Sequence, residues 1–446
     1  MRRIAAFAVV WGFALSPPLL ATDPVVEEQA PASDAATRDV GSAAAPLAAP
    51  AAQPAGMGFG GVPALNYDAD NGFGFGAVGT LYLYDGATRP YRTAITFQLF
   101  MTSNLVQDHS IAVDALRVMD LPLRIYSRVG YLQSLTQNYC GTGGTVTCDP
   151  AVARTAGEML GLGGEHLEQF ARRYYQRRFI NPYGVVTARW ALSQAPMRVE
   201  VIGGWRGLYF IPGNWFADDD GDGQADLTPY PNSLYADAHP DGEPGFLSAF
   251  QVGLMLDSRD NEPAPTRGWW IEGTARGAGP VTASTWSFAG ANLTVRGYTA
   301  VDPQRRLVLA NRLVMDVVVG DPPVQELVRV GGSLDYYVFG GGDMGRGIRT
   351  QRYIGKLRTL NQTEVRYRFV DFMLFEQRFS LTAAGFLDAG IVGQEIAAPG
   401  EIGAVAGGGG GLRLAWNENF VIRADVGVSP VEAWDPKLYI LINNPF

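Results

Sequence analysis

Several features that mark common protein classes are scarce or missing in this 446-residue sequence. After residue 21, no run of 18 apolar residues occurs, so a bundle of membrane-spanning helices is excluded. The chain has only two cysteines and three histidines, and its formal net charge of −9 argues against nucleic acid as a partner. It contains no nucleophile elbow, no His-Glu metal-binding helix and no phosphate-binding loop. These absences leave no case for an enzyme.

The N-terminal segment has the layout of a secretory signal peptide. Two arginines follow Met1, residues 4–20 are almost wholly apolar, and Ala21 offers a cleavage position. A membrane anchor is the alternative, although Pro17 and Pro18 shorten the helix that such an anchor needs.

The next segment, residues 22–56, is rich in Ala and Pro and shows no periodicity. Such a segment cannot bury enough apolar surface to offset the entropy lost on ordering, so it is predicted to be a disordered periplasmic linker. The expected domains are therefore a signal peptide (1–21), this linker (22–56) and a folded region (57–446).

Alternation of apolar and polar residues recurs throughout the folded region in segments of about ten residues. In residues 421–428, Arg423 and Asp425 share one face, and the other face is apolar, with Ile422, Ala424, Val426 and Val428. A period of two is typical of β-strands. A soluble sandwich would bury the apolar face against a second sheet, and a membrane barrel would turn it to lipid. Alternation alone leaves both folds open.

The lengths of the connections distinguish these two folds. Sixteen strands are expected, from 57–67 to 436–446, and every long connection (136–176, 212–245 and 320–360) follows an odd-numbered strand. Transmembrane barrels have short periplasmic turns and long external loops, whereas a sandwich has no reason to sort its loops in this way. We therefore predict an all-β fold, a 16-stranded antiparallel transmembrane β-barrel in the outer membrane of a Gram-negative bacterium.

The last residue, Phe446, is expected to end the closing strand. A C-terminal aromatic residue on an alternating strand looks like the signal that is read by the barrel-assembly machinery, and an ordinary edge strand ending in Phe is the alternative. Pro445 donates no hydrogen bond, so the seam between the first and last strands is expected to be weakly paired.

A glycine-rich motif in the 320–360 connection carries a family resemblance. Residues 340–349 read GGGDMGRGIR, residues 386–390 read FLDAG, and residues 256–268 read LDSRDNEPAPTRG. In this order, the motifs resemble those of the BamA/TamA (bacterial surface antigen) superfamily, in which the sixth external loop folds into the barrel. Gly345 and Ile348 depart from the residues usual in that loop, which predicts weaker packing of its tip.

The resemblance covers residues 57–446 and implies insertion or translocation of proteins, or of lipids, at the outer membrane. In that family the seam between the first and last strands opens. The 35 residues of 22–56 are too few for the family's periplasmic POTRA domains, so the chain resembles a subgroup without them. Outer-membrane lipid, protein clients and a separate periplasmic partner are the expected partners. A passive channel or structural protein that retains the fold without assembly activity is the alternative.

Arg346, with Gly347 beside it, is the residue that an inward-folded loop would carry into the lumen. A guanidinium in a partly dry interior needs a carboxylate, best in bidentate geometry. Alternation points Glu364 and Asp388 inward from the two strands that follow the loop. We predict that these residues form a latch. Whether it only stabilises the fold or takes part in the mechanism stays open.

The fourth external loop contains the pattern D-x-D-x-D-G-x-x-D. Ca²⁺ takes several oxygen ligands from a tight loop with Gly at its sharp turn. Pro229 stands where an EF-hand has Glu, so a hairpin-type Ca²⁺ loop is predicted, completed by Asp237 or Glu243, with a solvated acidic loop as the alternative. The candidate ligands are Asp218, Asp220, Asp222, Gln224 and Asp226.

Cys140 and Cys148 lie eight residues apart in a loop rich in Gly and Thr. An exported protein can keep a disulfide, so a local loop staple is predicted, and two free thiols are the alternative.

Overall fold

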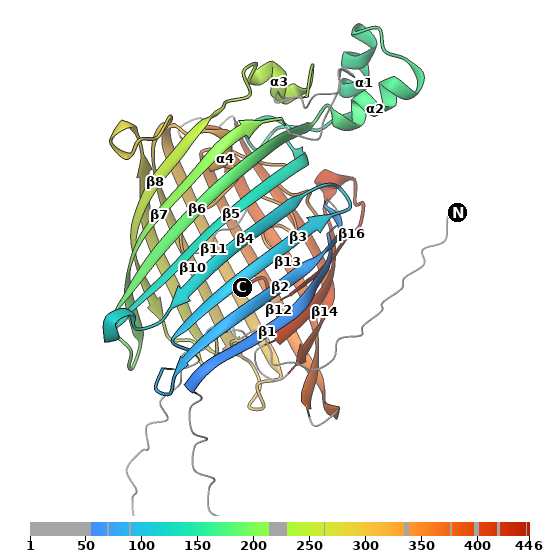
Figure 1. Cartoon of the computed structure of the whole chain (residues 1–446). Helices are drawn as coiled ribbons and strands as arrows, with labels where there is room; N and C mark the ends of the chain where they lie inside the picture. Colours follow the sequence, from blue (N-terminus) through green and yellow to red (C-terminus); the bar gives the residue numbers. More distant parts are fainter. Residues whose placement is uncertain are drawn as a thin grey trace, which may run out of the picture.

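The structure is a computed structural model of the chain and describes residues 55–68, 71–88, 91–213, 230–262, 264–333, 339–374, 377–396, 401–416, 420–442 and 444–446. Sixteen antiparallel strands form a closed barrel in which each strand pairs with its sequence neighbours and β1 pairs with β16 (Figure 1). The predicted fold class is confirmed. The strands are β1 (Ala55–Asp68), β2 (Gly72–Asp85), β3 (Thr93–Thr102), β4 (Gln107–Ala115), β5 (Leu123–Asn138), β6 (Gln176–Ser193), β7 (Arg198–Pro212), β8 (Gly245–Asp257), β9 (Gly268–Ala278), β10 (Ser287–Ala300), β11 (Leu307–Asp321), β12 (Leu357–Leu374), β13 (Gln377–Gly393), β14 (Ile402–Trp416), β15 (Phe420–Val428) and β16 (Lys437–Ile442).

The α-helices of the described residues all lie in connections that follow odd-numbered strands. α1 (Pro150–Met159) and α2 (Gly164–Arg173) follow β5, α3 (Leu234–Ala238) follows β7, and α4 (Val324–Leu327) follows β11. Figure 1 places α1, α2 and α3 at one end of the barrel, which we call the helix end, and the opposite end is the turn end. The long connections were expected after odd-numbered strands, and these helices lie in such connections. No helix in the described ranges is both long enough and apolar enough to cross a membrane.

In the connection that carries α1 and α2, the Cys140–Cys148 disulfide closes the short segment just before α1, with a Cα–Cα distance of 5.3 Å. α1 begins where Asp149 accepts a hydrogen bond from the Ala151 amide at 2.8 Å and Pro150 fills the first helical position. The missing amide of proline costs nothing at that position because it would have no partner within the helix.

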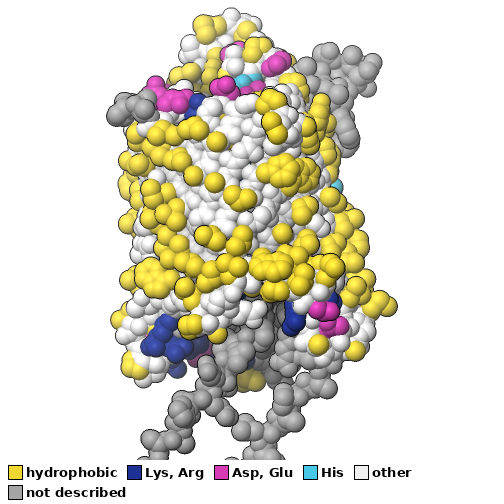
Figure 2. All heavy atoms as spheres, turned by 90° about the vertical axis from the view of Figure 1, so that its left-hand side faces the viewer, with side chains coloured by type: hydrophobic (Ala, Val, Ile, Leu, Met, Phe, Trp, Pro, Cys, Tyr) yellow, Lys and Arg dark blue, Asp and Glu magenta, His cyan; other side chains and the backbone are white. Residues whose placement is uncertain are grey.

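The outer face of the wall is apolar along strands that alternate. Val252 and Leu254 of β8 are 64% and 56% exposed. Met255, the next residue along the strand, is 1% exposed and faces the lumen. Figure 2 shows hydrophobic side chains spread over the wall, with Lys, Arg, Asp and Glu gathered near its two ends. This distribution is the one a barrel needs in order to face lipid.

The seam between β1 and β16 is the least paired junction of the barrel. β1 pairs with β2 along its whole length, but among the described residues it pairs with β16 only at Tyr67–Ile440 and Asp68–Tyr439. The expectation that Phe446 ends the closing strand is wrong, because β16 stops at Ile442. Pro445 cannot donate to a neighbouring strand, and Phe446, only 5% exposed, is buried instead.

Candidate functional site: a loop held inside the barrel by buried ion pairs

The described parts of the connection between β11 and β12, residues 322–333 and 339–356, fold into the lumen. Its apolar residues Phe339, Met344 and Ile348 are at most 2% exposed and join a buried cluster that includes Leu360 and Val392 of the wall. The expected weak packing of the loop tip is therefore wrong for Ile348, because an aliphatic side chain fills this space as an aromatic one would.

Two glycines beside Arg346 shape the loop, and one of them lets it approach the wall. Gly345 and Gly347 have φ values of +120° and +90°, which favour glycine. A Cβ atom at Gly347 would lie 2.6 Å from the backbone carbonyl of Val428, so any side chain here would push the loop away from β15. The Gly347 amide also donates to the Tyr439 hydroxyl on β16 at 3.2 Å. The loop therefore rests directly against the last two strands.

Arg346 lies between three carboxylates and is fully buried. Its Nε and Nη2 donate to the two oxygens of Asp388 at 2.9 and 2.8 Å, and its amide adds a third bond at 2.9 Å. Nη1 pairs with Glu364 and lies 3.5 Å from Asp425. The guanidinium also stacks over the Phe386 ring, 3.6 Å from its centroid. The structure thus brings together the residues of the expected latch in the bidentate geometry that favours Arg over Lys.

Three more arginines surround the same carboxylates. Arg366 Nε donates to Glu364 at 2.6 Å, Arg423 Nη1 donates to Asp425 at 3.0 Å, and Arg413 pairs with both. The four arginines share three buried carboxylates, and Arg423 also pairs with Asp343, whose side chain is 49% exposed. This pairing offsets the cost of removing the buried charges from water. The complete set, which we call the latch network, is Arg346, Arg366, Arg413 and Arg423 with Asp343, Glu364, Asp388 and Asp425.

Sequence reasoning placed Arg423 and Asp425 on the polar face of their strand but did not assign them to the latch. The missing step was their position around the barrel. The register Gly408–Val428 to Trp416–Phe420 aligns β15 with β14, which itself pairs with β13, so Asp425 comes to lie beside the strands that carry Glu364 and Asp388.

A second set of buried ion pairs holds the start of the loop and was not foreseen. Glu326 of α4 accepts from Arg276 Nε at 2.6 Å and pairs with Arg206. Arg276 also binds Asp316 at 2.9 Å, and Asp316 pairs with Arg358. The loop is thus anchored to β7, β9, β11 and β12 as well as to the latch network.

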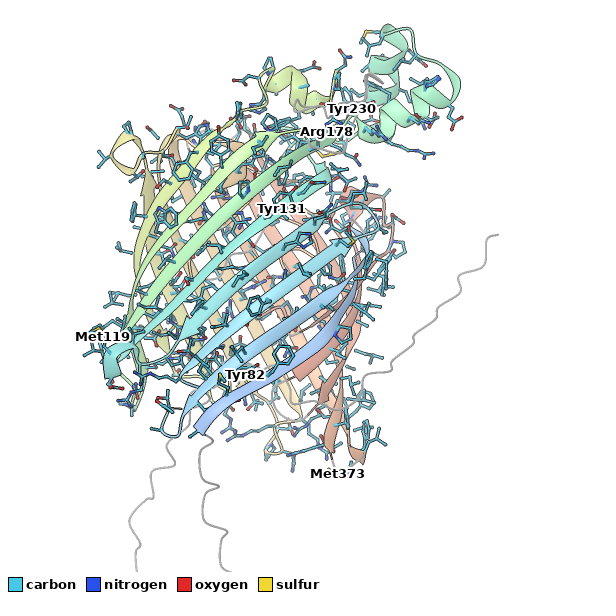
Figure 3. All side chains as sticks on the ribbon, in the orientation of Figure 1. Tyr82, Met119, Tyr131, Arg178, Tyr230 and Met373 are labelled. Carbon is cyan, nitrogen blue, oxygen red and sulfur yellow. A yellow bond between two sulfur atoms is a disulfide. The ribbon has the colours of Figure 1, made fainter. Side chains whose placement is uncertain are left out.

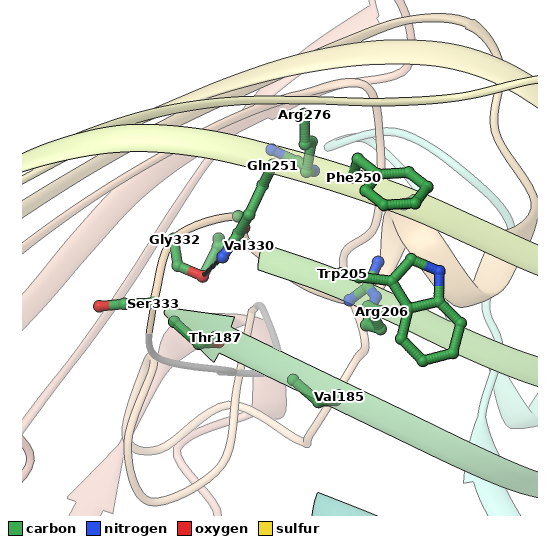
Figure 4. Close-up of a pocket in the computed structure, with 12 residues that line it drawn as sticks. Val185, Thr187, Trp205, Arg206, Phe250, Gln251, Arg276, Val330, Gly332 and Ser333 are labelled. Atoms are coloured by element: carbon green, nitrogen blue, oxygen red, sulfur yellow. Dashed lines mark hydrogen bonds between the residues drawn. The ribbon is translucent and has the colours of Figure 1, made fainter. Parts of the chain in front are cut away.

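Where this part of the loop meets the wall, Gln251 donates to the Gly332 carbonyl at 3.2 Å. Figure 4 shows Gln251 and Arg276 beside Val330 and Gly332, with the Trp205 ring on the other side of the wall strands. The cavity here measures about 60 Å³. Ligand pockets usually enclose several hundred Å³, so this gap is a packing defect and has no room for a small-molecule ligand.

The C-terminus also lies in the lumen. Arg312 Nη1 donates to the Pro445 carbonyl at 2.9 Å, and Arg366 Nη2 donates to the Phe446 carbonyl at 3.0 Å. The same two guanidinium groups lie 4.9 and 5.2 Å from the centre of the Phe446 ring, which packs against Tyr298. Because Arg366 also binds Glu364, the chain end is connected to the latch network.

The five proposed Ca²⁺ ligands, Asp218, Asp220, Asp222, Gln224 and Asp226, lie outside the described residues. Of the two acids expected to complete the shell, Glu243 instead accepts from the Val324 amide at 3.3 Å, and burial raises its pKa. Asp237 lies on the exposed side of α3. Among the described residues, no group of three or more His, Cys, Asp or Glu side chains could hold a metal ion.

With this geometry established, the comparison with known proteins is informative. The Omp85 superfamily domain matches residues 217–435, a range that includes the whole latch network and, of the second set of ion pairs, every residue except Arg206. The chain carries an Omp85 superfamily domain. This agrees with the family resemblance of the loop motifs and with the prediction that the protein is not an enzyme. No curated protein matches the chain in sequence.

Two solved structures resemble this Omp85 barrel. CdiB from Escherichia coli superimposes with a TM-score of 0.54 and 11% identity, and the match covers 87% of this chain and 62% of CdiB. BamA from Haemophilus ducreyi lacking POTRA domains 1–3 gives a TM-score of 0.49 and 10% identity, covering 87% of this chain and 69% of that one. The chain therefore spans less than two thirds of the CdiB chain that it matches, and CdiB shares its fold.

Proposed function

We propose that this Omp85 barrel inserts or translocates proteins at the outer membrane of a Gram-negative bacterium, with the turn end in the periplasm and the helix end outside. The observation that carries the proposal is the seam between β1 and β16. A client strand can enter the sheet only where backbone hydrogen-bonding groups are available, and an opened seam offers them to it. Membrane lipid, protein clients and a separate periplasmic partner are the proposed partners.

The two sides of the seam differ in how they are held. β16 is supported from within the barrel, because Tyr439 accepts a hydrogen bond from the loop at Gly347 and the chain end is bound by Arg312 and Arg366. β1 pairs with β2 and, over its first twelve described residues, with no described residue of β16. Opening would therefore leave β16 on the anchored loop and free the edge of β1.

This arrangement gives the latch network a mechanical role. Arg346 links the carboxylates of β12 and β13 to Asp425 of β15, so the loop fixes the position of the strands that end at the seam. Without such a support, loss of pairing at the seam would allow β15 and β16 to move as well. A sheet edge that templates a client strand needs one strand that is held in place and a neighbouring strand that can separate from it.

The test is to lock the seam with a reversible bond. Tyr67 and Ile440 face each other across it and are both 38% exposed on the outer wall, so Tyr67→Cys with Ile440→Cys should form a disulfide under oxidation. The matched control joins Val252 to Ala275, which are partners in the fully paired junction of β8 and β9. Both pairs are introduced with Cys140→Ser and Cys148→Ser, so that reduction affects only the new bond.

Assembly of a reporter outer-membrane protein is then followed in vesicles that contain each variant. We expect the locked seam to stop assembly and reduction to restore it, while the control pair has no effect under either condition. Equal assembly by the locked and reduced proteins would refute the proposal. Steady ion conductance through the locked barrel, combined with unchanged assembly, would favour the passive channel instead.

A further inference from the structure

A two-stranded ribbon extends from the barrel at the turn end. It consists of residues 370–374 of β12 and 377–381 of β13, which pair from Val370–Leu381 to Leu374–Gln377. A bulge between Arg368 and Val370 marks the point where the ribbon leaves the wall. Figure 3 shows Met373 at the extreme of the turn end, at the opposite end of the barrel from Tyr230 and the helices.

One edge of the ribbon is open. β11 pairs with β12 no farther than Leu307–Tyr367, and the last backbone bond runs from the Arg368 amide to the Arg306 carbonyl at 2.8 Å. Beyond it, no described strand pairs with residues 370–374 on that side. Alternate amides and carbonyls of this segment therefore lack a strand partner.

The open edge has few of the features that usually protect one. Proteins block exposed edges with Lys, Pro or unpaired charge. Residues 370–374 read VDFML and contain neither Lys nor Pro. Their single charge, Asp371, is compensated by Arg368 Nε at 3.6 Å and Arg306 Nη2 at 3.9 Å.

The ribbon also presents apolar side chains to solvent. Val370, Met373 and Leu374 are 40%, 65% and 47% exposed. Val370 and Leu374 share a face with Phe372, whose ring stacks on Phe379 of β13 at 5.4 Å. An apolar face beside an open backbone edge is the combination that an added strand uses, because its backbone fills the edge and its alternate side chains cover the face.

We propose that the open edge of this ribbon binds an extended segment of an incoming client protein with alternating apolar residues. Lipid is a poorer occupant, because hydrocarbon satisfies no amide or carbonyl. A permanent protein partner is also poorer, since stable interfaces engage about 20–30 residues a side and this edge offers only a short stretch. A transient client strand fits both limits.

The ribbon lies within reach of the seam. β12 and β16 are four strands apart, which is about 19 Å at the usual spacing of about 4.8 Å between strands. An extended segment of ten residues spans about 33 Å. A client held at the ribbon could therefore contact the seam at the same time. The inference rests on the proposed function and names the surface that a client would meet first.

The experiment uses the full chain in detergent and a soluble ten-residue peptide in which Val and Lys alternate. A photoreactive group is attached at Met373→Cys on the ribbon or, as a control, at Met119→Cys. Met119 is 82% exposed in the turn after β4, and Figure 3 places it at the same end of the barrel, away from the ribbon. A second control peptide has the same composition, with its valines and lysines in two blocks.

We expect the alternating peptide to crosslink about fivefold more from position 373 than from 119. Val370→Lys or Leu374→Lys should reduce this yield by about fivefold, because an apolar contact is lost and the new ammonium group repels the lysines of the peptide. Each Lys variant must keep the parent's melting behaviour, and Leu374→Lys, at the end of the strand, is the safer of the two. Equal yields at both positions, or equal capture of the block peptide, would overturn the inference.

The same group can be tested against vesicles of anionic phospholipid without peptide, and crosslinking to lipid that excludes the peptide would also overturn it. The seam experiment separates the two proposals. Loss of assembly on locking, with no peptide capture, defeats only the role of the ribbon. Peptide capture with no effect of locking defeats the proposed function and leaves the ribbon as a strand-binding surface.

Discussion

The wall formed by β12 and β13 and the seam between β1 and β16 show two ways of closing the same barrel. β12 and β13 pair from Leu357–Gly393 to Leu374–Gln377, and the latch network crosses them from the lumen. β1 and β16 share two paired positions in the described residues, and no ion pair joins them there. The junction of β12 and β13 is held by backbone hydrogen bonds and by buried ion pairs, whereas the seam is held by a short stretch of backbone pairing.

The difference shows that closure and rigidity are separate properties of this sheet. A barrel must leave no open edge in lipid, so even a short seam is needed. Its strength, however, depends on how many residues of β16 stay extended. The chain end turns inward, where Arg312 and Arg366 bind its carbonyl groups. Its last residues therefore do not pair with β1 at the seam.

The largest expected effect is at the junction of β12 and β13, which the latch network holds. Arg346→Ala leaves Glu364 and Asp388 buried without their main counter-charge, and breaking a buried pair in this way costs about 3–5 kcal/mol. We expect a marked fall in the temperature at which the barrel unfolds, seen as lost heat-modifiability on gels. Arg346→Lys keeps the charge but not the bidentate geometry, so its loss should be smaller. An unchanged melting temperature in Arg346→Ala would show that the network does not fix this wall.

A smaller effect is expected at the seam, where the buried chain end supports β16. Phe446→Ala removes a buried ring and its contacts with two guanidinium groups, which should cost about 3 kcal/mol of unfolding free energy, the low end for a buried Phe because the chain end can relax into the space. Phe446→Tyr keeps the ring and is the matched control. If the tail supports β16, hydrogen exchange should also rise in residues 437–442 of the Ala variant while β12 stays protected. Equal exchange in both strands would remove the contrast between the two regions.

The disulfide should affect neither region. The chain-entropy estimate for a loop of this length is about 2.5 kcal/mol, but the bond lies in the connection at the helix end and constrains only the segment between its two cysteines. We expect Cys140→Ser with Cys148→Ser to speed proteolysis within residues 141–147. The melting temperature of the barrel should not change. A fall comparable with that of Phe446→Ala would mean that this loop helps to hold the wall.

The smallest effect concerns the proposed Ca²⁺ loop. Asp220→Asn with Asp222→Asn should abolish Ca²⁺ binding measured by calorimetry, because Ca²⁺ affinity depends on the number of charged ligands. The barrel's melting temperature should stay the same, since none of the proposed ligands belongs to the latch network. Binding that persists in the double variant, or is absent from the parent chain, would contradict the proposed site.

The sequence alone determined the strand number, the sorting of loops and two of the three carboxylates that surround Arg346, Glu364 and Asp388. Strand patterns repeat every two residues, so inward positions such as Glu364 and Asp388 can be read directly along the chain. Long connections are visible as lengths, and the loop motif is contiguous. Each of these signals is local, which is why the sixteen strands and the core of the latch were predictable.

The tertiary structure decided what depends on position around the barrel. Asp425 and Arg413 joined the latch network only through the register of three strands, and Glu326 found Arg206 and Arg276 across the lumen from a connection with no regular pattern. The fate of Phe446 was of the same kind. The alternating pattern predicted that the chain end continues the last strand. Pro445 has no amide to donate to the sheet, and the arginines of the lumen bind the chain end instead. These arginines are distant in sequence, so only the tertiary structure showed that they lie beside Phe446.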